Sequence, residues 1–83
     1  MKFPLYTRIA LAADIPQENL RRGDIATIVE YYEATAGQEC GYELEVFNAV
    51  GDTIAVITVA ESQIESLRKD EILAVRPRNQ LAA

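Results

Sequence analysis

Apolar and polar side chains alternate most strictly along residues 42–47, where Glu43 and Glu45 occupy the polar positions. A period of two is typical of an antiparallel strand with one face in the core and the other in water. Gly51-Asp52 then signals a tight turn, and the following run, residues 53–59, is nearly all β-branched. The pattern therefore predicts a β-hairpin around residues 48–52.

Three further segments are predicted to be strands. Residues 3–11 and 25–32 are rich in β-branched and aromatic residues, and Pro4 is confined to the start of the first of them. Residues 72–75 form a last short apolar run that Pro77 would stop. Apolar groups fall on both faces of residues 25–32, so the pattern leaves its buried face open. A strongly bent barrel strand would explain this, because its halves would face different parts of the core.

The connections between these strands are less regular. Residues 17–23 are polar except for Leu20, which we expect to pin this loop to the core. Ile64 and Leu67 lie three residues apart, which predicts a single helical turn within residues 60–67. Ser62 is the candidate N-cap of that turn.

The order of these elements predicts an all-β fold, a small five-stranded SH3-like barrel with one short helical turn before the last strand. A chain of 83 residues has room for one core. We expect residues 1–77 to form the barrel domain and residues 78–83 a flexible C-terminal tail. Barrel closure would also remove the exposed strand edges that invite aggregation.

A family resemblance narrows this picture. Asp14-Ile15-Pro16, Leu20 and the run from Gly23 to Glu30 resemble the signature of a bacterial family of short SH3-like proteins, domain-of-unknown-function family 4926. The pattern continues to residue 59, and the resemblance covers roughly residues 5–76. Two departures are Ala26, where glycine is common, and a longer stretch at residues 33–41. The resemblance implies the SH3-like barrel and no established enzymatic activity. Because family members often lie beside small toxin-like genes, it also implies an antitoxin or immunity role.

The turn at Gly23-Asp24 also resembles the start of a KOW motif, which occurs in ribosome- and transcription-associated barrels. Any SH3-like barrel needs such a turn before a strand, so the signal is not specific. Arg21 and Arg22 would be the nucleic-acid contacts in this alternative function. The net charge of −5 and the pI of about 4.6 disfavour it, because an acidic protein repels a phosphate backbone.

Composition excludes much common chemistry. The absence of histidine removes the commonest general base and the commonest metal ligand. Cys40 is the single cysteine, and neighbouring Glu39 would raise the pKa of its thiol. We therefore expect no enzymatic activity, no catalytic residue, no metal site and no cofactor.

One cysteine allows no internal disulfide, which favours the cytoplasm as the location of the protein. No segment reaches the roughly 20 apolar residues of a membrane span, and Pro4 and Arg8 interrupt any signal-peptide core.

The remaining functional candidate is a surface for another protein. The candidate partner-binding residues, which we expect on one side of the barrel, are Glu30, Tyr32, Glu43, Glu45 and Phe47. Their charge would suit a basic partner, although strand alternation alone also explains the glutamates as a solvated outer face. Homo-oligomerisation stays open, because the apolar strand at residues 53–59 could lie at an interface and small barrels gain stability by dimerising.

Overall fold

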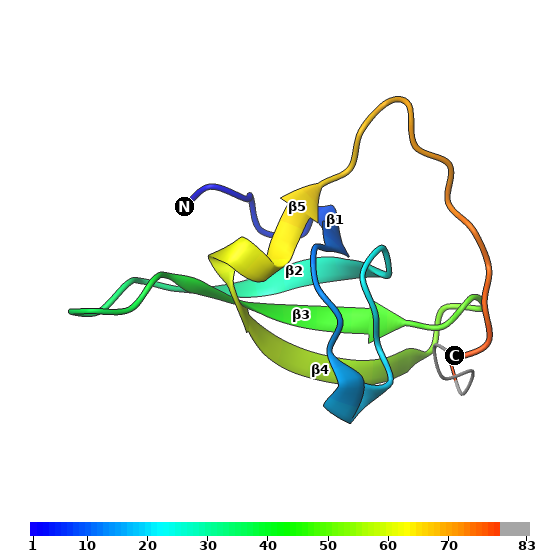
Figure 1. The fold of residues 1–83 in the computed structure, drawn as a ribbon, viewed down its shortest axis with the longest axis horizontal. Helices are drawn as coiled ribbons and strands as arrows, with labels where there is room; N and C mark the ends of the chain where they lie inside the picture. The colour runs from blue at the N-terminus through cyan, green and yellow to red at the C-terminus, as the bar shows by residue number, and fades with distance from the viewer. Residues whose placement is uncertain (79–83) are drawn as a thin grey trace.

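The computed structural model describes residues 1–78 and confirms the all-β fold. Its five strands are β1 (Arg8–Leu11), β2 (Ile25–Tyr32), β3 (Gly41–Phe47), β4 (Thr53–Ala60) and β5 (Ile64–Ser66). They form one antiparallel sheet in the order β4-β3-β2-β1-β5 (Figure 1), an SH3-like arrangement. Within residues 1–78, β4 and β5 are the terminal strands and do not pair with each other, so the expectation that barrel closure removes the strand edges was wrong. Between these strands lie two single 3-10 turns, η1 (Pro16–Glu18) and η2 (Glu61–Gln63), the second directly before β5.

The hairpin between β3 and β4 is confirmed, and its turn explains the register. The side-chain oxygen of Asn48 accepts hydrogen bonds from the backbone N–H groups of Val50 (3.1 Å) and Asp52 (2.9 Å). Gly51 has a φ of +93°, which a residue with a Cβ rarely adopts. These local bonds close the turn and leave Leu44 opposite Ile57 inside the sheet.

Strand β2 changes faces through a β-bulge. Ile28 pairs with Leu44, but the next paired residue is Glu30, which lies opposite Glu43, so that Val29 is an extra residue. Without the bulge, alternation would turn Glu30 into the core. The bulge accounts for the apolar residues on both faces of β2, for which the sequence pattern predicted a strongly bent strand.

The core is centred on Tyr42. Its buried ring meets the Phe3 ring edge-on at 5.6 Å between centroids and the Tyr31 ring at 5.3 Å. Leu20 is buried as predicted, and it holds the loop between β1 and β2 through a backbone bridge to Ile15. The other residues of the core cluster are Ile9, Leu11, Ala26, Ile28, Leu44, Val46, Ile57, Val59 and Ile64.

The first strand is shorter than predicted, beginning at Arg8 instead of residue 3. Tyr6 has a φ of +65°, a left-handed conformation that interrupts a strand. The preceding residues still serve the core, since Phe3 is buried, but the segment is not a continuous strand.

The C-terminal prediction was wrong in detail. Ile64 belongs to β5, where it pairs with Leu11 of β1, and the helical turn lies just before it in η2. Ser62 lies inside η2 and is not its N-cap; the Gln63 side chain instead accepts a hydrogen bond from the Ala60 N–H at 2.8 Å. The spacing of Ile64 and Leu67 does not mark one helical turn, because Ile64 ends η2 and begins β5 whereas Leu67 lies beyond that strand.

Residues 72–75 are not a strand. They lie in an extended segment that bows away from the sheet (Figure 1) before the chain returns to the body at Arg76. Their apolar side chains are outside the core, with Ile72 92% and Val75 89% exposed. Strand propensity is present, but within residues 1–78 no neighbouring strand pairs with the segment.

Of the predicted tail, Arg78 is described, and residues 79–83 lie outside the described residues. The Arg78 guanidinium donates to the backbone carbonyls of Glu18 (2.9 and 3.2 Å) and Ile54 (3.1 Å). The chain is thus attached to η1 and to β4 at this point. In the described part of the chain, no helix is long and apolar enough to cross a membrane.

Candidate functional site

The five residues predicted to bind a partner lie on the outer face of the β2–β3–β4 sheet. Glu43, Glu45 and Phe47 alternate along β3 with the buried residues of that strand. The bulge in β2 places Glu30 directly opposite Glu43, and Tyr32 follows opposite Gly41. Period-two alternation is therefore right about β3, whereas the position of Glu30 depends on the bulge.

No described cation is paired with the glutamates of this face. The salt bridges within residues 1–78 are Arg68–Asp70, Arg76–Asp24 and Arg78–Glu18, and they all lie elsewhere. Directly opposed like charges in a sheet are unfavourable, by roughly 0.2–1 kcal/mol per pair. Glu30 is exposed and Glu43 is half-buried, so water screens the repulsion between them.

Local hydrogen bonds partly fix these carboxylates. A carboxylate oxygen of Glu30 accepts from the Tyr31 N–H at 3.2 Å, and Glu45 accepts from the Thr53 hydroxyl at 2.5 Å. Both bonds leave acceptor oxygens available to water or to a partner. The face is thus an array of oriented negative charges.

Exposed hydrophobic side chains accompany this charge. Tyr32 is 44% exposed and Phe47 is 41% exposed. Partial burial raises the pKa of the Tyr32 phenol, and the charges of Glu43 and Glu30 raise it further. Val56 of β4, opposite Glu45, is also exposed. Sequence reasoning missed Val56, because a strand of nearly uniform β-branched residues shows no polar face.

A second cluster surrounds Cys40 and Tyr42. The Tyr42 hydroxyl donates to a Glu61 carboxylate oxygen at 2.6 Å, and the Cys40 thiol donates to the same oxygen at 3.1 Å. The Tyr42 oxygen accepts from the backbone N–H groups of Lys2 and Phe3, each at 3.1 Å. This network fastens the N-terminal segment and η2 to β3.

The network also sets the protonation of its members. Hydrogen bonds from Tyr42 and Cys40 lower the pKa of Glu61. The pKa of the Cys40 thiol is raised, first by its hydrogen bond to Glu61 and then by desolvation. Glu39 was expected to have that effect, but its carboxylate instead accepts from the Ser62 N–H (2.8 Å) and hydroxyl (3.1 Å). A protonated thiol is a poor nucleophile and a poor metal ligand.

Arg21 and Arg22, the predicted nucleic-acid contacts, lie among carboxylates. Asp24 accepts from the backbone N–H of Arg21 and Asp14 from that of Arg22, each at 2.8 Å. The guanidinium of Arg76 forms a two-pronged ion pair with Asp24 at the same turn. Negative and positive groups are therefore interleaved around this loop.

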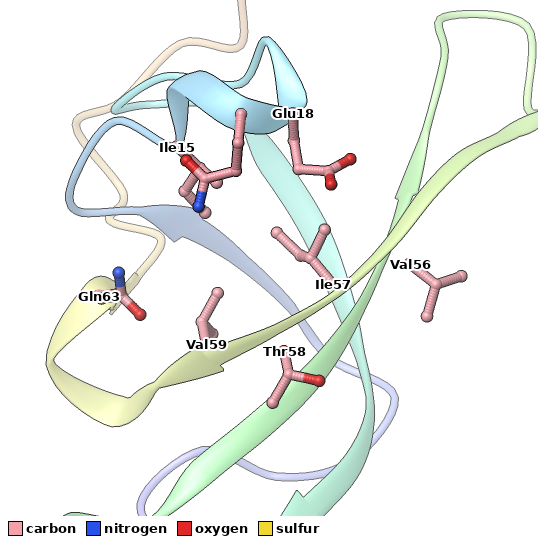
Figure 2. Close-up of a pocket in the computed structure, with 8 residues that line it drawn as sticks. Ile15, Glu18, Val56, Ile57, Thr58, Val59 and Gln63 are labelled. Atoms are coloured by element: carbon pink, nitrogen blue, oxygen red, sulfur yellow. The ribbon is translucent and has the colours of Figure 1, made fainter.

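A shallow hollow of about 380 Å³ lies between η1 and β4. Figure 2 shows Ile57 and Val59 pointing toward η1, whereas Val56 and Thr58 point to the opposite side of β4. The lining residues are Ile15, Gln17, Glu18, Val56, Ile57, Thr58, Val59 and Gln63. In the described part of the chain, no three of the Cys, Asp and Glu residues are grouped so that they could hold a metal ion.

A small antiparallel sheet with SH3-like strand order and an acidic outer face defines the class of this domain. The family model described as "Domain of unknown function (DUF4926)" matches residues 5–66, so the chain belongs to that family. The match ends at the last residue of β5 and leaves out the segment that follows it. No curated protein and no solved structure matches the chain significantly.

Proposed function

We propose that this domain is a non-catalytic protein-interaction module that docks a basic protein through the outer face of β2, β3 and β4. The observation that carries the proposal is the juxtaposition of Glu30, Glu43 and Glu45 with the exposed rings of Tyr32 and Phe47. Exposed aromatics supply hydrophobic contact area, and the carboxylates supply complementarity to lysine or arginine.

The internal energetics of the face support this function. Opposed carboxylates contribute nothing to the stability of the free domain, and a partner's cation between Glu30 and Glu43 would relieve their repulsion. An antitoxin or immunity role, in which the basic partner is a neighbouring gene product, is the form of this function that agrees with the family resemblance. No comparable observation favours nucleic-acid binding, since Asp14 and Asp24 accept hydrogen bonds from the backbone of Arg22 and Arg21 and place negative charge in the same loop.

The test is co-expression with each product of the adjacent genes, followed by size-exclusion chromatography and titration calorimetry of any co-eluting pair. We expect co-elution with the wild-type domain and binding weakened about tenfold or more in the double variant Glu43→Gln/Glu45→Gln. Glu65→Gln/Glu71→Gln is the matched control, because it removes the same two charges outside the face, on β5 and in the segment that follows β5. Absence of co-elution with every neighbour, or equal losses in the control, would refute the proposed function.

A further inference from the structure

Within residues 1–78, no strand pairs with the middle of the outward edge of β4. Strand β4 is the terminal strand of the sheet, so one row of its backbone groups points away from β3. The Glu61 N–H donates to the Cys40 carbonyl at 3.0 Å, and hydrogen-bonded pairs alternate along an antiparallel ladder. This alternation directs the N–H and C=O groups of Val56 and Thr58 outward. The Ala60 N–H agrees with this alternation: Ala60 lies two residues after Thr58, and its N–H bonds to the Gln63 side chain and not to β3.

Side chains cap both ends of this edge. The Gln63 side chain accepts from the Ala60 N–H at 2.8 Å, and Arg78 donates to the Ile54 carbonyl at 3.1 Å. Between these caps lie five uncharged residues, 55–59, and four of them line the hollow beside η1 (Figure 2). The capped ends therefore define an open stretch of edge about 17 Å long.

The same chain carries a segment suited to that edge. Residues 72–75 are Ile-Leu-Ala-Val, and their three large side chains are 92%, 53% and 89% exposed. The segment is held away from the sheet (Figure 1) and is anchored at its far end by the ion pair of Arg76 with Asp24. Three large apolar side chains exposed within four residues form a patch that favours contact with a partner.

We propose that residues 72–75 of one copy of this chain add as a β-strand to the open edge of β4 in a second copy. Four residues span about 13 Å, which fits within the open stretch between the two caps. Residues 55–59 of the edge and residues 72–75 of the segment are all uncharged, whereas a basic partner suits the acidic outer face. Each copy carries both surfaces, and a reciprocal exchange closes two copies into a two-fold dimer, whereas one-way addition would continue into a filament.

The experiment measures molar mass by light scattering across a concentration series, together with amide exchange of β4. We expect the wild-type protein to form a dimer in which the Val56 and Thr58 amides are protected. Val75→Asp places a charge in the contact and is expected to raise the dimer dissociation constant at least about tenfold. Val50→Asp, at a residue 83% exposed in the β3–β4 turn, is the matched control and should leave the dimer intact.

Thr58→Pro tests the other half of the contact. Proline removes an N–H that points away from β3, so the monomer should keep its fold, as circular dichroism would verify, while the intermolecular ladder is lost. If this variant unfolds, Val56→Asp replaces it. A monomeric wild-type protein at millimolar concentration would overturn the proposal. So would a dimer that Val75→Asp leaves intact, or amides of β4 that are protected only by a strand from a different protein.

Discussion

Glu30 and Glu43 lie directly opposite each other across β2 and β3, although their carboxylates carry the same charge. Residue pairs at this position in an antiparallel sheet have Cβ atoms about 4.5–5.5 Å apart, which is close enough for repulsion. A sheet selected for stability alone would place an opposite charge or a β-branched pair there. The arrangement of charges on the outer face therefore lowers the stability of the isolated domain.

Glu30→Lys should stabilise the free domain. The substitution turns an opposed like-charge pair into an opposed ion pair, and we expect the free energy of unfolding to rise by about 0.5–1 kcal/mol. Urea denaturation at low ionic strength measures the change, and salt should diminish it. Glu33→Lys makes the same charge change in the exposed loop beyond β2. Equal stabilisation by both variants would show that net charge, and not the pairing, is responsible.

Deletion of Val29 should be tolerated. Because Val29 is the extra residue of the bulge, its removal leaves Ile28 opposite Leu44 and Glu30 opposite Glu43 in a regular ladder. We expect a folded domain that is destabilised by about 1–2 kcal/mol, since a half-buried side chain is lost. Deletion of Thr27 should instead abolish cooperative unfolding, because it turns the first half of β2 over. Thermal melts followed by circular dichroism would separate the two, and equal damage would contradict the bulge assignment.

Tyr42→Phe should destabilise the domain by about 2 kcal/mol. The substitution keeps the ring against Phe3 but removes a hydroxyl that donates to the Glu61 carboxylate and accepts two backbone N–H groups. Hydrogen bonds to charged groups contribute about 1.5–3 kcal/mol, and the loss leaves donors without their partner. Chemical denaturation measures the loss, with Tyr6→Phe at an exposed position as the control. A loss below about 0.5 kcal/mol would show that water replaces the hydroxyl.

Glu61 should make stability depend on acidity. Its hydrogen bonds from Tyr42 and Cys40 lower its pKa in the folded state below the ordinary value of 4.5. A carboxylate of this kind stabilises the fold at pH values above 4.5, and that stabilisation is lost as the pH falls through the lowered pKa. The difference in urea midpoint between the wild type and Glu61→Gln should therefore shrink from pH 6 to pH 3. A difference that stays constant or grows would contradict this assignment, and Glu71→Gln is the exposed control.

The sequence is informative where contacts are local or strictly periodic. Residues 42–47 and 53–59 were identified almost to their ends, because alternation and a glycine turn specify a hairpin without distant contacts. The membership of β5 could not be identified in the same way. Ile64 is in the sheet because it pairs with Leu11, 53 positions earlier. Residues 72–75 also have strand propensity, but they have no such partner in the described part of the chain.

The residues of the candidate site also differ in how far the sequence predicts their positions. Glu43 and Glu45 share a face by period two, so their position was predictable. Glu30 lies on the same face only because of the bulge at Val29, and no residue type in β2 predicts that bulge. The network of Tyr42, Cys40 and Glu61 also had no sequence signal, because its members come together only when η2 packs against the start of β3.

The capped edge of β4 affects the tendency of the protein to aggregate at high concentration. An uncovered strand edge templates the addition of further chains, which is how fibrils with cross-β order elongate. Gln63 and Arg78 shorten the template from both ends by occupying the Ala60 N–H and the Ile54 carbonyl. These two polar side chains therefore shorten the stretch of β4 to which the backbone of a further chain can bond.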